Sequence, residues 1–172
     1  MSTDLADILR FCISPDEFAP LGRETMILAR YIEIQRIRLS GSFTFTLSLP
    51  EALENCLVPK MILQPIVENA ILHGIDGVED GTVAVDIAEG PDGMLHITVS
   101  DNGHGLPPRL IGPFRQTGPD RAGGRLGLYN VGTILLKYYG EGCGLILKSN
   151  AQGRGAVVTA VLPVRREEGP PC

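Results

Sequence analysis

The chain has 172 residues, enough for one domain with a sizeable core, and a net charge of −5. The acidic balance excludes a broad nucleic-acid-binding surface, and no apolar run approaches the roughly 20 residues that a membrane-spanning helix needs. The four cysteines are far apart and form no Cys-x-x-Cys pair, so neither a zinc site nor a disulfide framework is expected. Scattered free thiols favour a cytoplasmic location.

The N-terminal third of the chain predicts two helices and one strand. A short helix is expected at residues 3–13, followed by a proline-containing linker and a longer helix at residues 23–39. A strand with alternating apolar residues is expected at residues 42–49 and ends at Pro50. The longer helix carries one predicted apolar stripe, made of Ile27, Leu28, Tyr31, Ile34 and Ile37.

The segment PKMILQPIVENAILHGI, at residues 59–75, predicts the next helix. Proline is favoured in the first turn of a helix, so Pro59 is expected to begin it. Pro65 lies inside the pattern, where it is expected to kink the helix or to remove one backbone hydrogen bond. Gly74 is expected to end the helix.

The remainder of the chain predicts strands around one further helix. The expected elements are strands at 82–88 and 95–100, a loop at 106–124, a helix at 126–140, and strands at 143–149 and 155–163. Strands outnumber helices, and regular β-α-β alternation is missing. We therefore predict an α/β (α+β) two-layer sandwich, with a mixed, mostly antiparallel sheet and helices on one face.

The segment VENAILHG places two polar side chains on one face of the predicted helix. Asn69 and His73 are four residues apart, so they are neighbours on the helix surface. An asparagine carbonyl oxygen suits Mg²⁺, which takes hard oxygen ligands and keeps several waters. The alternative is that Asn69 bonds only backbone groups and that His73 is a helix-end histidine near the negative end of the helix dipole.

The segment VSDNGHG follows an alternating strand and stops it at an acid and two glycines. Asn-Gly is a common turn signal, so an ordinary turn is one interpretation, and Asn102 would then be only a turn residue. In the other interpretation, Gly103 and Gly105 let a flat ligand approach the backbone. The Asp101 carboxylate would then accept a hydrogen bond from an exocyclic amine such as that of adenine.

The segment GGRLGLYN lies where the last predicted helix begins. Glycine-rich backbone before a helix N-terminus is typical of a phosphate-binding site. Four arginines within seventeen residues of an acidic protein also favour an anion nearby: Arg109, Arg115, Arg121 and Arg125. The alternative is a solvated flexible loop with a glycine-rich exit.

Together these three segments resemble the N box and the two glycine boxes of the gyrase, Hsp90, histidine kinase and MutL ATPase superfamily, in the same order. The runs ARYIEIQRIRLSGSF and LVPKMILQPIVENAILHGI are similar to those of LytS/YesM-type sensor histidine kinases. The resemblance covers roughly residues 20 to 163 and implies a Bergerat ATP-binding fold. It implies the end of a dimerisation helix and a linker at 1–19, an ATP-binding catalytic domain at 20–164 and a disordered tail at 165–172.

On the phosphate side, the resemblance implies that Asn69 coordinates a Mg²⁺ ion that bridges the ATP phosphates. His73 would contact the phosphates, and Glu68 would help to order the waters of the metal. Gly127 and Leu128 would present backbone groups to the phosphates.

On the base side, the resemblance implies that Asp101 binds the adenine amine while Gly103 and Gly105 shape the adenine floor. Residues 106–124 would form the ATP lid. Arg125 departs from the family pattern, because it stands where the second glycine box usually has a glycine. Arg125 would either be strained by a positive φ or reach the phosphates while the preceding glycines form the bend.

The family's phosphoacceptor segment, His-Phe-Leu-Phe-Asn, does not occur in the sequence. The resemblance therefore implies the catalytic part of a longer two-component sensor kinase, a membrane-anchored homodimer with this part in the cytoplasm. It would donate the ATP γ-phosphoryl to a histidine on its own upstream dimerisation domain and signal to a response regulator. Alone, the chain is expected to bind ATP without autophosphorylation.

A single spacing favours a kinase over a hydrolase. Gyrase- and MutL-like ATPases carry a water-activating glutamate four residues before the magnesium asparagine, and this position is Pro65 here. Two other classes remain open. One is a nucleotide-binding regulatory or interaction module of the same superfamily with weak or no kinase activity, and the other is a protein-serine kinase that binds an anti-sigma partner.

Overall fold

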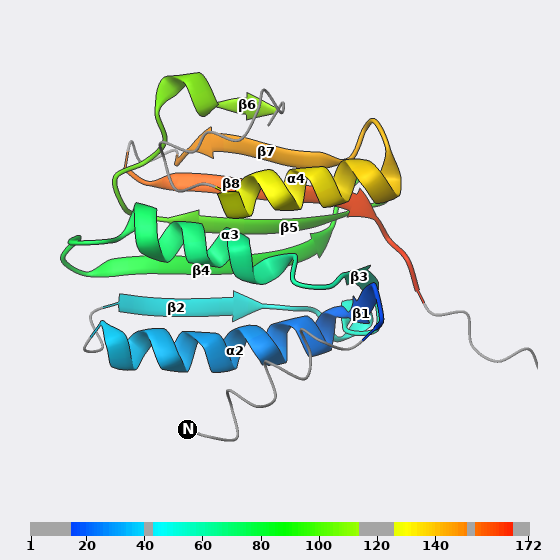
Figure 1. Cartoon of the computed structure of the whole chain (residues 1–172), viewed down its shortest axis with the longest axis horizontal. Coiled ribbons are helices and arrows are strands. Elements are labelled where there is room, and N and C mark those ends of the chain that lie inside the picture. Colours follow the sequence, from blue (N-terminus) through cyan, green and yellow to red (C-terminus); the bar gives the residue numbers. More distant parts are fainter. Residues whose placement is uncertain (1–14, 40–42, 114–125, 151–153, 167–172) are drawn as a thin grey trace, which may run out of the picture.

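The computed structural model describes residues 15–39, 43–113, 126–150 and 154–166 (Figure 1). The helix predicted at 3–13 lies outside the described residues, as do Arg125 and much of the predicted lid. The described elements in chain order are β1 (Phe18–Pro20), α2 (Leu21–Arg38), β2 (Phe43–Ser48), the 3-10 turn η1 (Glu51–Leu53), β3 (Leu57–Pro59), α3 (Leu63–Asn69), the π-helical turn η2 (Ala70–Gly74), β4 (Gly81–Glu89), β5 (Met94–Asp101), the 3-10 turn η3 (Pro108–Leu110), β6 (Gly112–Pro113), α4 (Leu126–Tyr139), β7 (Gly144–Ser149) and β8 (Ala156–Pro163).

Six strands form one sheet in the order β2-β4-β5-β8-β7-β6. The pairing of β2 with β4 is parallel, and the other pairings in this sheet are antiparallel. The helices α2, α3 and α4 lie on one side of it and share a single core cluster with its strands (Figure 1). The predicted two-layer sandwich with a mixed, mostly antiparallel sheet is confirmed.

At both predicted ends of the domain, the backbone pairs with the segment around β3. The short strand β1 falls partly in the predicted linker and pairs antiparallel with β3, which sequence patterning missed. At the other end, the carbonyl of Arg165 accepts a hydrogen bond from the Leu57 N–H at 2.6 Å, and Arg166 forms an isolated bridge with Cys56. The first two residues of the predicted tail therefore contact the body of the domain.

The core lies between the helices and the inner face of the sheet. Along β5, Leu95, Ile97 and Val99 are at most 2% exposed, as the alternating pattern predicted. On α3, Ile66 and Val67 are fully buried against them. This packing orients the end of β5 and the end of α3 toward each other.

The predicted apolar stripe of α2 is wrong at its C-terminal end. Ile34 and Ile37 are 37% and 62% exposed, whereas Ile32 is 2% exposed and lies in the core. Both Ile32 and Ile34 lie one turn from residues in the buried stripe, so the periodicity alone fits either side of the helix. The packing partners of α2 decide which side is buried.

The predicted start of the next helix is also wrong. Pro59 is the last residue of β3, Met61 has a positive φ of 61°, and α3 begins only at Leu63. Pro65 therefore occupies the first turn of α3, where a backbone N–H has no partner within the helix, so no helical hydrogen bond is lost. The helix ends as predicted at Gly74, after the π-helical turn η2.

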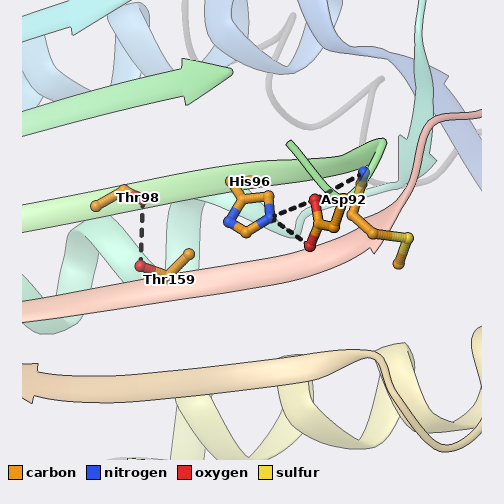
Figure 2. A network of polar contacts seen from close by, with 5 residues as sticks. Asp92, His96, Thr98 and Thr159 are labelled. Atoms are coloured by element: carbon orange, nitrogen blue, oxygen red, sulfur yellow. Dashed lines mark hydrogen bonds and ion pairs between the residues drawn. The ribbon is translucent and has the colours of Figure 1, made fainter. Parts of the chain in front are cut away.

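The outer face of the sheet carries polar side chains that hold β5 in register (Figure 2). Both carboxylate oxygens of Asp92 lie 3.1 Å from His96 Nε2, and one of them accepts the Met94 N–H at 3.0 Å. The Met94 N–H, followed by His96, lowers the pKa of the Asp92 carboxyl. Across the β5–β8 pair, the hydroxyls of Thr98 and Thr159 lie 3.2 Å apart. The Asp92 contacts tie the turn before β5 to the start of that strand, and the threonine contact lies across the β5–β8 pair.

Glu24 is a buried acidic residue on α2, and only 3% of it is exposed. Its Oε1 accepts a hydrogen bond from the backbone N–H of Met61 at 2.8 Å. Burial raises the pKa of Glu24 to about 7, although hydrogen bonds from the backbone of residues 61–63 and the charge of Lys60 oppose this shift.

We expect the pKa of Glu24 to make stability depend on pH. The raised pKa favours the protonated folded state, so its contribution is fully present below the unfolded pKa of 4.5 and is lost as the pH rises through about 7. Between about pH 5.5 and 8, the free energy of unfolding should fall by about 2 kcal/mol more in the parent protein than in Glu24→Gln. Urea denaturation at both pH values measures this difference. An equal change in the free energy of unfolding in both proteins would contradict the raised pKa of Glu24.

Candidate functional site

A cavity of about 220 Å³ lies between α3 with η2 and the first turn of α4. Five residues predicted for the phosphate side meet here: Glu68, Asn69, His73, Gly127 and Leu128. Pro65, Leu72 and Leu126 complete the lining. The structure therefore brings the N box and the second glycine box together, although they lie more than fifty residues apart in the chain.

Asn69 has an unusual environment in this cavity. The residue is 8% exposed, and its Oδ1 is buried and has no hydrogen-bond partner among the described residues. Leaving a buried carbonyl oxygen unpaired costs free energy, so this atom is suited to a ligand that enters the cavity. An amide oxygen is a ligand type that Mg²⁺ accepts, and the donor set fits this ion.

The described part of the chain contains no group of three or more His, Cys, Asp or Glu residues placed to hold a metal ion. Mg²⁺ does not need such a group, because it commonly binds through one or two protein oxygens together with water and substrate phosphates.

Gly127 allows α4 to approach α3 closely. A Cβ on Gly127 would lie 3.1 Å from Cβ of Pro65, which is tighter than most such contacts. The Leu128 side chain is fully buried, so it is the backbone at the start of α4 that borders the cavity. Pro65 stands where a hydrolase would carry its base, and it has no group that could accept a proton.

Asp101 is the last residue of β5 and is 5% exposed. Its Oδ1 accepts hydrogen bonds from the backbone N–H of Gly103 at 2.9 Å and of Ala156 at 3.2 Å. Burial raises the pKa of the Asp101 carboxyl, and these two N–H groups and His104 partly oppose the shift. The carboxylate is therefore held in one orientation by backbone groups from two segments.

The segments VENAILHG and SDNGHG touch each other at Gly74. A Cβ on Gly74 would lie 2.8 Å from Cγ of Asp101, so only glycine admits the carboxyl group here. The carbonyl of Gly74 accepts the His104 N–H at 2.9 Å, and a Cβ on Gly103 would collide with the same carbonyl. Gly74 therefore joins the two motifs in addition to ending the helix.

Asn102 does more than form a turn. Its Oδ1 accepts the backbone N–H of Thr82 at 2.7 Å, and its Nδ2 donates to the carbonyl of Asp80 at 3.0 Å. Asn150 also contributes, because its Nδ2 donates to the carbonyl of Asp101 at 3.2 Å. Sequence reasoning missed both roles, since the partners are distant in the chain and no local pattern indicates them.

A larger cavity, of about 620 Å³, adjoins the loop that follows β5. Its lining is Gly77, Val78, Glu79, Asp80, Asn102, Gly103, His104 and Arg154. It contains Gly103, whereas Asp101 and Gly105 border neither cavity. We place the candidate phosphate site in the smaller cavity, because only that one combines the unpaired Asn69 oxygen with the start of α4.

Gly105 has a φ of 78°, a conformation that favours glycine, and a Cβ there would lie 3.3 Å from the carbonyl oxygen of Gly155. Arg125 lies outside the described residues, so its predicted role near the phosphates stays a prediction. The predicted lid begins with η3 and β6, and its residues 114–124 also lie outside the described part.

An α/β sandwich in which a helix-borne asparagine shares a cavity with the start of a second helix is suited to binding a nucleotide phosphate. A family model described as "Histidine kinase-, DNA gyrase B-, and HSP90-like ATPase" matches residues 58–166. The chain belongs to this family.

Two curated relatives are sensor proteins of Bacillus subtilis strain 168. Sensor histidine kinase YesM is 30% identical over 152 residues, which cover 88% of this chain and 25% of YesM. Sensor protein LytS is 26% identical over 148 residues, which cover 86% of this chain and 25% of LytS. The chain thus spans about a quarter of the length of these relatives, and the predicted resemblance to the LytS/YesM type is confirmed.

Among solved structures, the mycobacterial sensor histidine kinase MprB superimposes with a TM-score of 0.60 at 23% identity, covering 87% of this chain and 98% of that one. This likeness supports the fold. The family model and the curated relatives confirm the predicted class, an ATP-binding catalytic domain of the sensor histidine kinase type. No helix in the described residues is long and apolar enough to cross a membrane.

Proposed function

We propose that this domain binds Mg²⁺-ATP between α3 and α4 and donates the γ-phosphoryl group to a histidine on another domain. The observation that carries the proposal is the Oδ1 of Asn69, which is buried and has no partner in the part of the chain that the structure describes, on a residue that lines a cavity shared with the start of α4. Membership of the histidine kinase-like ATPase family supports it.

On this proposal, side chains and backbone groups around the smaller cavity bind the metal and the phosphates. Asn69 would supply the protein oxygen to Mg²⁺, which neutralises phosphate charge when it is bound. Glu68 would accept hydrogen bonds from the waters of the metal, and the exposed His73 would face the phosphates. The backbone N–H groups of Gly127 and Leu128, at the start of α4, would bind phosphate oxygens.

Base recognition is assigned to the far end of β5. The Asp101 carboxylate would accept a hydrogen bond from the adenine amine, and Gly103 and Gly105 would keep the neighbouring backbone free of side chains. Backbone hydrogen bonds already fix the Asp101 carboxylate, so little rotational freedom would be lost on binding.

Phosphoryl transfer in this site would depend on positioning and charge neutralisation rather than on a general base. Pro65 occupies the position from which a base could activate water, which disfavours hydrolysis. A histidine ring nitrogen would attack the γ-phosphorus, the bond to the bridging oxygen would break, and ADP would leave.

For the longer kinase that would contain this domain, we propose a membrane-anchored homodimer with this domain in the cytoplasm. The acceptor histidine would lie on its own upstream dimerisation domain, and the phosphoryl group would pass on to a response regulator. The similarity to sensor proteins of the YesM and LytS type supports this arrangement.

We expect Asn69→Ala to abolish most of the magnesium dependence of ATP binding. Isothermal titration with ATP, in Mg²⁺ and in EDTA, should show that the gain in affinity from Mg²⁺ falls by at least about 10-fold, the value of one charge-assisted contact. Gln64→Ala is the matched control, because Gln64 lies on the same helix and its buried Oε1 also lacks a partner among the described residues, but it does not line the cavity.

Measurements on the unmutated chain distinguish the functional classes. Absence of magnesium-dependent ATP binding in this chain would contradict the proposal. ATP binding without phosphoryl transfer to an added dimerisation domain would instead indicate the alternative class, a nucleotide-binding regulatory or interaction module.

A further inference from the structure

The turn that leads into α3 depends on α2 for a hydrogen-bond acceptor. The residue before α3 is Ile62, whose apolar side chain cannot cap the helix. The backbone N–H of Met61 instead donates to Oε1 of Glu24, 37 residues earlier in the chain, at 2.8 Å. Backbone hydrogen bonds from Ile62 and Leu63 also favour the ionised form of this carboxyl.

Met61 occupies a conformation that needs support from its surroundings. Its φ of 61° lies in the left-handed region, which is unfavourable for a residue with a Cβ. Its side chain packs against Ala19 and Ile27, and its N–H is held by Glu24. The segment around β1 and the first half of α2 therefore hold this turn by both its side chain and its backbone.

This turn is the near end of the element that carries Asn69. Helix α3 has seven residues, so the rise from Leu63 to Asn69 is only about 9 Å. Beyond α3, the end of η2 is held where the Gly74 carbonyl accepts the His104 N–H. A displacement of the Met61 turn would therefore pass along a short, rigid helix to the Asn69 oxygen.

We infer that Glu24 is a positioning residue, which holds the Met61 turn and thereby sets the place of the Asn69 oxygen in the nucleotide cavity. The inference rests on the proposed function of Asn69 as the magnesium ligand. Glu24 itself lines neither cavity.

The burial of Glu24 supports a role beyond packing. Burial raises the pKa of its carboxyl to about 7, so a charge is carried in the core at pH 8, with Lys60 as the facing charged group. An apolar side chain would avoid this cost but would leave the Met61 N–H without its acceptor.

The test measures ATP affinity in Mg²⁺ and in EDTA for folded Glu24→Ala, Glu24→Gln and Thr25→Ala at pH 8. Glu24→Ala is expected to reduce the gain in affinity from Mg²⁺ by about 10-fold, as losses in the outer shell of metal sites do, with affinity in EDTA changed by less than about 2-fold. Glu24→Gln keeps an oxygen that can accept the Met61 N–H and should restore the gain.

Thr25→Ala is the control, because Thr25 is also buried on α2 but its hydroxyl donates to the Gly22 carbonyl of its own helix. It should leave the magnesium gain unchanged. A merely structural role would lower both affinities of Glu24→Ala together through unfolding, and that result would overturn the inference, as would an unchanged gain.

If Glu24→Ala does not fold, Glu24→Asp takes its place, since a shorter acid withdraws the acceptor from Met61 while keeping the charge. An unchanged magnesium gain in Glu24→Asp would then overturn the inference. Failure of the proposed function is distinguishable, because in that case the parent protein would itself show no magnesium gain.

Discussion

Asp101→Asn is expected to weaken ATP binding by about 10- to 150-fold, the range of one charge-assisted hydrogen bond of about 1.5–3 kcal/mol. The amide oxygen of asparagine can still accept the N–H groups of Gly103 and Ala156, so the domain should stay folded. Isothermal titration with Mg²⁺-ATP measures the affinity, and circular dichroism checks the fold.

The pH dependence gives this prediction a second readout. Because burial raises the pKa of the Asp101 carboxyl, protonation begins at a higher pH than for a free aspartate. ATP affinity of the parent protein should therefore fall as the medium becomes acidic, and this component should be missing in Asp101→Asn. Asp86→Asn is the matched control, since Asp86 is exposed on β4. Equal affinities in the parent and in Asp101→Asn would contradict the assignment of Asp101.

Gly103→Ala is expected to lower the free energy of unfolding by about 3 kcal/mol, near the upper end of typical overpacking costs. The new Cβ would meet the backbone carbonyl of Gly74, and neither the end of the N-box helix nor the loop after β5 can yield without breaking contacts at Asp101. Urea denaturation gives the loss, and ATP titration should show binding weakened in parallel.

Gly93→Ala is the control for the effect of removing a glycine. Gly93 has a φ of 71°, but a Cβ there would meet no atom within 4 Å, so only the cost of a left-handed conformation, about 1 kcal/mol, is expected. A loss at Gly103 no greater than that at Gly93 would mean that the two motifs do not pack as described.

The sequence predicted best what depends on near neighbours in the chain. The alternation of Leu95, Ile97 and Val99 identified β5 and its buried face, because period-two patterning is a property of the strand itself. The spacing of Asn69 and His73 placed both side chains at one cavity for the same reason. The composition of the boxes also indicated the family, which the comparisons confirm.

The failures concern contacts between distant segments. The start of α3 was misplaced because Glu24 stabilises the left-handed turn at Met61. No local sequence pattern indicates this hydrogen bond, since the two residues are 37 positions apart. The exposed Ile34 was placed in the core because a helical stripe has two possible edges, and only the neighbours of α2 select one. Asn102 was taken for a simple turn residue because its partners lie on β4 and the loop before it.

By itself, the sequence determined the types of the longer described elements and the sandwich class, and it indicated which residues form the nucleotide boxes, since each follows from local periodicity or from a contiguous motif. Only the tertiary structure decided how the boxes fit together. Gly103 was expected to make room for a ligand, but its missing side chain first makes room for the Gly74 carbonyl. The physical reason is that close packing is set by atoms from distant parts of the chain, which meet only after the sheet and helices have assembled.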